Sequence, residues 1–137
     1  MAVSLPPLTR APDERVNWVS SIPFLLVHVL CFAVIFTGFT WTAIGLFVFM
    51  YFGRAFFVTA GYHRYFSHKT YRLNRFWQFV FAFQAEATAQ KGVLWWAANH
   101  RHHHRYSDMQ NDLHSPRKGF WWSHVGWILS DKYKDTD

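Results

Sequence analysis

Residues 43–68 read AIGLFVFMYFGRAFFVTAGYHRYFSH, an apolar run that ends in two histidines five positions apart. Up to residue 60 the run contains a single charged side chain, Arg54. A membrane-spanning helix needs about 20 mostly apolar residues, with a range of about 17 to 25, so residues 43–60 qualify as a span. The stretch therefore predicts a membrane helix that delivers histidines to the edge of the lipid.

A second apolar run precedes this one along the chain. Residues 22–39, IPFLLVHVLCFAVIFTGF, carry no formal charge and also reach the length of a span. The short TWT link between the runs predicts a tight helical hairpin, and strands are excluded because only helices satisfy their backbone polar groups in lipid. Lys and Arg flank the hairpin on both outer sides and are absent from the link. The positive-inside tendency therefore predicts an integral, multi-pass membrane protein whose N-terminus and histidines are cytoplasmic.

The composition indicates a membrane part followed by a part in water. Of the 137 residues, 51% are hydrophobic and 21% are aromatic, whereas only 16% are charged, below the roughly 25% of soluble proteins. The net charge of +6 suits acidic headgroups, and the apolar runs favour a membrane surface over nucleic acid. The predicted fold is all-α, with a polar N-terminal tail (1–21), two transmembrane helices (22–62) and a cytoplasmic or interfacial part (63–137).

Two further segments are predicted to be helices that do not cross the membrane. If residues 76–90 were a span, the two histidine-rich stretches would face opposite sides of the membrane and could not share a site. This segment is therefore predicted to pack against protein or to lie at the interface. Residues 120–129, FWWSHVGWIL, are too short to span, and their tryptophans predict an interfacial helix.

A second histidine-rich stretch, NHRHHHRYSD, occupies residues 99–108. Neutral imidazole is a common ligand of zinc, copper, iron and nickel. Positions i, i+3 and i+4 share one face of a helix, so His100, His103 and His104 are predicted metal ligands. His102 falls about 200° from His100 around the helix axis and is predicted to face solvent.

The spacing of the first pair, His63 and His68, does not suit a straight α-helix. Five positions correspond to a rotation of about 140° around the axis, so the two rings would point apart. The second apolar helix is therefore predicted to continue to about His63 and then to break, which lets residues 64–68 curl back toward a shared site.

These motifs resemble those of a known enzyme family. TAGYHRYFSH (59–68) resembles the first histidine box of the membrane fatty acid desaturases, and NHRHHHRYSD (99–108) resembles their second box. DLHSPRKGFWWSHVGWIL (112–129) is similar to the segment that follows the second box in the acyl-CoA (stearoyl-CoA-type, delta-9) branch. The resemblance implies an oxidoreductase that uses O2 and two electrons to insert a double bond into a fatty acyl chain.

The resemblance also implies cofactors, partners and site residues. Two iron ions (Fe2+) are expected, with no catalytic residue beyond their ligands, which match His63, His68, His100, His103 and His104. The implied partners are a fatty acyl substrate on CoA or another carrier, O2, membrane lipid and an electron-donor protein similar to cytochrome b5 or ferredoxin. The third histidine box of the family has no counterpart in this sequence, so the chain is expected to be an N-terminal fragment of the enzyme.

Five polar residues are weaker candidates. Asn99, Asp108 and Asp112 lie close enough in sequence to hydrogen-bond the ligand histidines and fix their rings, and a solvated role fits each of them equally well. Arg117 and Lys118 are candidates for contact with an anionic headgroup of the substrate, and anionic lipid or solvent fits them as well. Two alternative functions stay open: a membrane di-iron hydroxylase or oxygenase with the same boxes, and a non-catalytic metal-binding membrane protein.

Overall fold

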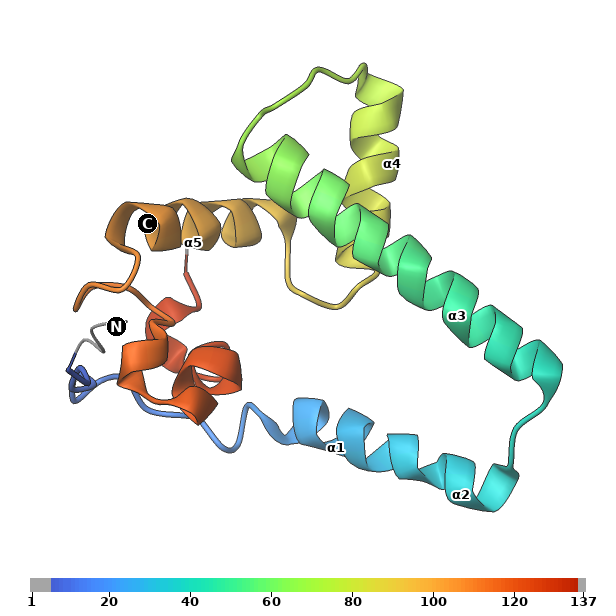
Figure 1. The fold of residues 1–137 in the computed structure, drawn as a ribbon, viewed down its shortest axis with the longest axis horizontal. Coiled ribbons are helices and arrows are strands. Elements are labelled where there is room, and N and C mark those ends of the chain that lie inside the picture. The colour runs from blue at the N-terminus through green and yellow to red at the C-terminus, as the bar shows by residue number, and fades with distance from the viewer. Residues whose placement is uncertain (1–5, 136–137) are drawn as a thin grey trace, which may run out of the picture. The chain divides into compact units, whose positions relative to one another are not determined.

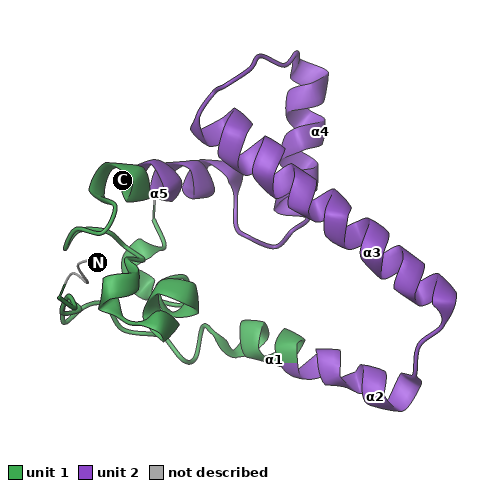
Figure 2. Ribbon diagram, viewed as in Figure 1, with its two compact units in different colours: residues 1–28, 102–137 green, residues 29–101 purple. Residues whose placement is uncertain are grey.

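The computed structural model describes residues 6–135 (Figure 1). The chain divides into two compact units (Figure 2). The central unit comprises residues 29–101, and the terminal unit combines residues 1–28 with residues 102–137. This division differs from the three predicted segments, 1–21, 22–62 and 63–137. Residues 1–5 of the first segment and residues 136–137 of the last lie outside the described residues.

All regular elements within residues 6–135 are helices, as the sequence predicts. The first apolar run forms α1 (Ile22–Leu30), a 3-10 turn (Cys31–Ala33) and α2 (Val34–Thr37). Gly38 then takes a positive φ of 66°, which ends the helix and turns the chain toward α3. α3 (Trp41–Phe56) begins at Thr40, whose hydroxyl accepts a hydrogen bond from the Ala43 amide at 3.1 Å.

The apolar helices have almost no cover from the rest of the chain. No residue of α1, α2 or α3 is buried, although nearly every side chain on them is apolar. By length and composition, one helix in the described chain is suited to cross a membrane, the continuous Trp41–Ser67, whereas the apolar helix Ile22–Thr37 is shorter. The second predicted span is thus present as a long apolar helix, and the two-span hairpin stays a prediction.

The helix that carries the first histidines does not break after His63. α3 continues directly into a π-helix, Phe57–Ser67, in which each amide bonds the carbonyl five residues earlier. The prediction of a break at His63 is therefore wrong, because a wider turn replaces the interruption. Lys69, with φ of 52°, then reverses the chain toward the next helix.

α4 (Arg75–Glu86) covers the π-helix with one face and leaves the other face exposed. Phe81 meets the rings of Phe57 and Tyr65 at centroid distances of 5.3 and 6.5 Å, and Ala85 is fully buried. On the opposite face Phe79 and Phe83 are more than 60% exposed. Residues 76–90 thus contain a helix packed against protein on one side, as predicted. α5 (Val93–Tyr106) follows after a short loop.

The terminal unit joins residues from both ends of the chain. Val16 forms an isolated antiparallel bridge with Ser130, and the ammonium group of Lys118 donates to the Glu14 carboxylate at 2.7 Å. The Glu14 carboxylate also accepts a hydrogen bond from the Tyr133 hydroxyl at 2.6 Å. The described part of the predicted polar tail is therefore built into a compact unit.

Short helices complete the terminal unit: the 3-10 turns Pro116–Lys118 and Asp131–Tyr133, and a second π-helix, Trp122–Gly126. Residues 120–129 are thus partly helical, as predicted, but their tryptophans do not share one environment. Trp121 is 75% exposed, whereas Trp122 is buried and its indole N–H donates to the Leu113 carbonyl at 3.0 Å. Trp122 contributes to a core and not to an interface.

Candidate metal centre

The π-helix brings together the two histidines that an α-helix would hold apart. The His68 amide bonds the His63 carbonyl at 3.1 Å, which is the five-residue step of a π-helix. The wider turn therefore places the two residues much closer around the axis than the roughly 140° of an α-helix. The two rings meet edge to face with centroids 4.7 Å apart, so the five-residue spacing is converted into a pair of adjacent imidazoles.

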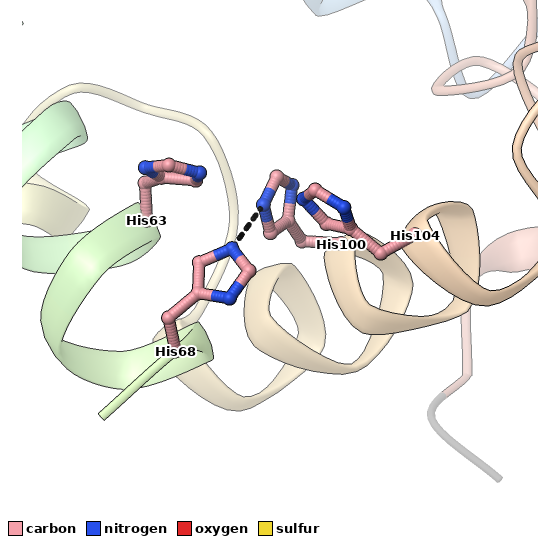
Figure 3. Close-up of side chains that lie close together, drawn as sticks. All are labelled: His63, His68, His100 and His104. Atoms are coloured by element: carbon pink, nitrogen blue, oxygen red, sulfur yellow. Dashed lines mark hydrogen bonds between the residues drawn. The ribbon is translucent and has the colours of Figure 1, made fainter. Parts of the chain in front are cut away.

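α5 supplies the next member of this group from a distant part of the sequence. The Nε2 atoms of His68 and His100 are 3.2 Å apart, and the rings of His63 and His100 have centroids 4.7 Å apart. α5 continues without interruption across the unit boundary, so His104 follows His100 by one turn on the same helix face. One ring nitrogen from each of the four histidines lies within 4.8 Å of those of the others (Figure 3).

This donor set fits a transition-metal ion. Two ligands bound at about 2.1 Å and at a right angle have nitrogens roughly 3 Å apart, close to the 3.2 Å between His68 and His100. His63 and His100 are half-buried, whereas His68 and His104 are exposed. Imidazole is a ligand of iron, zinc, copper and nickel alike, so the geometry indicates a candidate metal centre of nitrogen ligands without identifying the ion. We call His63, His68, His100 and His104 the four-histidine group.

An aromatic stack backs the His100 ring inside the central unit. Trp96 lies over His100 with centroids 4.6 Å apart, and Tyr62, which is fully buried, lies nearly parallel to Trp96 at 5.2 Å. The Trp96 indole N–H donates to the Gln90 side chain at 3.2 Å, and the Tyr62 hydroxyl donates to the Lys91 carbonyl. These contacts restrict the orientation of the His100 ring and therefore the direction in which its nitrogens point.

His103 belongs to a different cluster, within the terminal unit. Its Nδ1 is 2.9 Å from Oδ1 of Asp112, a fully buried carboxylate. The His114 ring stacks on that of His103 with centroids 4.1 Å apart. Asp112 also accepts hydrogen bonds from the amides of Asp108 and His114, at 3.0 and 3.2 Å. Both carboxylate oxygens are thus occupied, so Asp112 holds His103 in place.

The charges of this cluster follow from these contacts. Burial alone would raise the pKa of Asp112, but hydrogen bonds from His103 and from the amides of Asp108 and His114 outweigh it and hold that pKa below its ordinary value. Burial lowers the pKa of His114, so its imidazole is held neutral. Because an ionised carboxylate only accepts, Nδ1 of His103 is the donor. In the neutral ring, Nε2 of His103 then carries the lone pair.

The predicted site residues thus fall into separate places. Four of the five predicted ligands form the four-histidine group, whereas His103 pairs with Asp112. His102 is exposed with Nε2 2.9 Å from the Asn111 carbonyl, as its angular position predicts. His114, which is not among the predicted ligands, is a member of the second cluster, and its position two residues after Asp112 is the sequence signal for it.

The polar candidates also take different roles. Asn99 donates to the Trp95 carbonyl on its own helix at 3.0 Å, and Asp108 contributes backbone groups to the Asp112 and Arg117 contacts. Arg117 donates to the Pro6 and Asp108 carbonyls at 2.9 and 2.7 Å. Lys118 is only 6% exposed. The predicted headgroup contact through Lys118 is therefore not supported, because its ammonium group is buried against Glu14.

The sequence is similar to several curated enzymes. It is 33% identical to the sn-1 stearoyl-lipid 9-desaturase of Anabaena variabilis over 89% of this chain and 46% of that protein. It is 37% identical to an acyl-CoA 5-desaturase of Anemone leveillei over 78% of the chain and 33% of the relative. It is 32% identical to the delta-9 acyl-lipid desaturase 1 of Arabidopsis thaliana over 88% of the chain and 39% of the relative.

The chain spans less than half the length of these curated relatives. No protein-family model matches it, and no solved structure matches it.

Proposed function

Because this chain belongs to the fatty acid desaturase family, we propose that it forms the iron-binding region of a membrane enzyme that inserts double bonds into fatty acyl chains. The observation that carries the proposal is the approach of His68 and His100, 32 positions apart, to 3.2 Å between their Nε2 atoms. Two segments that are far apart in the sequence thus bring their imidazoles together at the end of a long apolar helix.

We propose that the four-histidine group holds one iron ion and that His103 is a ligand of a second. Iron bound here would supply, with O2 and two electrons, the oxidising power needed to remove two hydrogens from unactivated methylene groups. The chain contributes the ligands and fixes their rings: the π-helix aligns His63 with His68, and Asp112 leaves Nε2 of His103 as the nitrogen with a lone pair.

A cavity in the central unit supports an apolar substrate. It measures about 460 Å³, and its walls include Phe47, Met50 and Tyr51, with Arg54 and Gln90 among its few polar groups. Gln90 accepts the hydrogen bond from Trp96, the ring stacked on His100. We therefore propose that this cavity receives part of the acyl chain. Because the relatives are named for lipid-linked and CoA-linked substrates, the proposal extends to the acyl chain and not to its carrier.

The membrane arrangement is part of the same proposal. Trp41–Ser67 would cross the lipid, Ile22–Thr37 would pair with it as a second span, and the N-terminus and histidines would be cytoplasmic, since Lys and Arg flank the outer ends. The two electrons that the reaction consumes imply a cytoplasmic electron-donor protein as a partner. The exposed apolar surface of α1, α2 and α3 favours lipid as their environment.

The proposal is tested by expressing the complete protein in cells that lack their own desaturase. We expect monounsaturated fatty acids, detected by gas chromatography with mass spectrometry, to appear only under O2, and we expect iron to co-purify with the protein. A hydroxylated product would replace the proposal with the hydroxylase alternative. Metal-loaded protein without any modified fatty acid would favour the non-catalytic alternative.

Replacing Asp112 with asparagine should weaken metal binding by His103. The amide removes the charge and one acceptor but nearly keeps the volume, and outer partners of ligand histidines are worth about 10- to 100-fold in metal affinity. We expect about half of the bound iron to be lost on dialysis, measured by elemental analysis, because the four-histidine group remains intact. Asp108→Asn is the matched control, since Asp108 acts through its backbone. Full iron retention in Asp112→Asn would contradict this role.

A further inference from the structure

The π-helix at Phe57–Ser67 requires an explanation, because π-helices are rare and usually extend over a single turn. An α-helix over the same residues would separate His63 from His68 by about 140° around the axis. The wide turn is thus what makes the pair, and some contact must favour it over the ordinary α-helix.

Hydroxyl groups near the end of this helix bind carbonyls within it. The Tyr71 hydroxyl donates to the Ala60 carbonyl at 2.5 Å, and the buried Ser67 hydroxyl donates to the Tyr62 carbonyl at 2.7 Å. Thr70 adds two hydrogen bonds to the Arg64 carbonyl, from its amide at 3.1 Å and its hydroxyl at 3.2 Å. The Ser67 bond lies within the helix, whereas the bonds of Thr70 and Tyr71 connect the segment after the helix to it.

Tyr71 occupies the central place among these contacts. The positive φ of Lys69 turns the chain back on itself, so Tyr71 lies beside the helix that ended four residues earlier. Its ring packs on Tyr65, with centroids 5.4 Å apart, and faces Phe81 of α4 at 6.4 Å. Ala60, which accepts its hydroxyl, lies three residues before His63. Tyr71 thus connects the chain reversal, the π-helix and α4.

We propose that Tyr71 is a positioning residue of the candidate metal centre: its bond to the Ala60 carbonyl holds the π-helical turn that brings the His63 and His68 rings together edge to face. Tyr71 acts through the backbone carbonyl that its hydroxyl binds. The inference rests on the proposed metal binding by the four-histidine group, and it assigns the geometry of that group to a hydroxyl outside it.

The test is Tyr71→Phe, which removes the hydroxyl and keeps the ring. In the purified complete protein in detergent, we expect affinity for Co2+, followed by its visible absorption, to fall about tenfold. Amide hydrogen exchange over residues 60–68 of the metal-free protein should become faster. Tyr65→Phe is the matched control, because the Tyr65 ring packs in the same cluster, and both readouts should equal those of the wild type.

The outcomes separate the inference from the function on which it rests. Unchanged Co2+ affinity and exchange in Tyr71→Phe, with metal bound through His68 in the wild type, would overturn the positioning role alone. If His68→Ala bound Co2+ as tightly as the wild type, the proposed metal centre would fail, and the positioning role with it. A lower melting temperature of Tyr71→Phe with exchange over residues 60–68 no faster than in the wild type would likewise overturn the positioning role.

Discussion

Replacing His100 with alanine should abolish double-bond formation and remove iron from the four-histidine group. The His100 ring lies 4.7 Å from that of His63 between centroids, and its Nε2 is 3.2 Å from that of His68, so it is the member that joins the two segments. Because outer partners of ligands are worth about 10- to 100-fold in affinity or activity, loss of a ligand should cost at least about a hundredfold. Fatty acid analysis and iron content measure the effect.

His102→Ala is the matched control, since it removes the same side chain from the same helix. His102 is exposed, and its ring faces the Asn111 carbonyl and Tyr106. We expect this variant to retain iron and activity within about twofold, the level of an ordinary surface substitution. Equal losses in both variants would show that α5 itself, and not a ligand on it, had been damaged. Retained desaturation in His100→Ala would remove the four-histidine group from the reaction.

The second large effect is expected from Lys118→Met, which leaves the Glu14 carboxylate buried without its cation. The two side chains of this ion pair are 1% and 2% exposed, so solvent does not screen it. Removing one partner of a buried pair costs about 3–5 kcal/mol of unfolding free energy. Denaturant unfolding in detergent, followed by tryptophan fluorescence, measures the loss, since Trp122 lies in the same unit.

Lys134→Met provides the comparison for a pair on the surface. Lys134 pairs with Asp131, and the two side chains are 44% and 57% exposed, so its removal should cost at most about 1 kcal/mol. If the two variants lost the same free energy of unfolding, the buried ion pair would stabilise the terminal unit no more than the exposed pair does.

The pH dependence separates the charge of Glu14 from its packing. Burial raises the pKa of Glu14, but bonds from Lys118, Tyr133 and the Ala11 amide outweigh it and hold that pKa below its ordinary value. The resulting stability is present above the pKa of the unfolded state, about 4.3, and is lost as the pH falls through the lower folded value. Glu14→Gln should therefore flatten the acid limb of the stability curve.

The sequence predicts which histidines form the four-histidine group better than it predicts their geometry. His100 and His104 follow from the four-residue period of an α-helix, and the structure places them on one face of α5. His63 and His68 are correctly predicted to converge, but the predicted break is wrong, because an α-helical period places the two rings apart and the rarer π-helix brings them together without a break. The hydroxyl bonds that favour the wider turn depend on where Tyr71 returns, which local periodicity does not show.

Contacts between distant residues explain the remaining differences. The helical period predicts His103 on the same face as His100 and His104, but its ring is hydrogen-bonded to Asp112, nine positions later. In its basic turn, Lys118 has the sequence context of a solvent-exposed cation. It is buried because it pairs with Glu14, 104 positions away. A local sequence pattern predicts which side chains share a face of a helix, but it does not predict an ion pair between residues more than a hundred positions apart.

That long closure has a consequence for the order of events during translation. Glu14 leaves the ribosome far ahead of Lys118, and at about 5–20 residues per second the delay amounts to roughly 5–20 s. The apolar residues 22–67 are all synthesised within this interval. Glu14 can therefore form its ion pair with Lys118 only after both apolar helices have been synthesised.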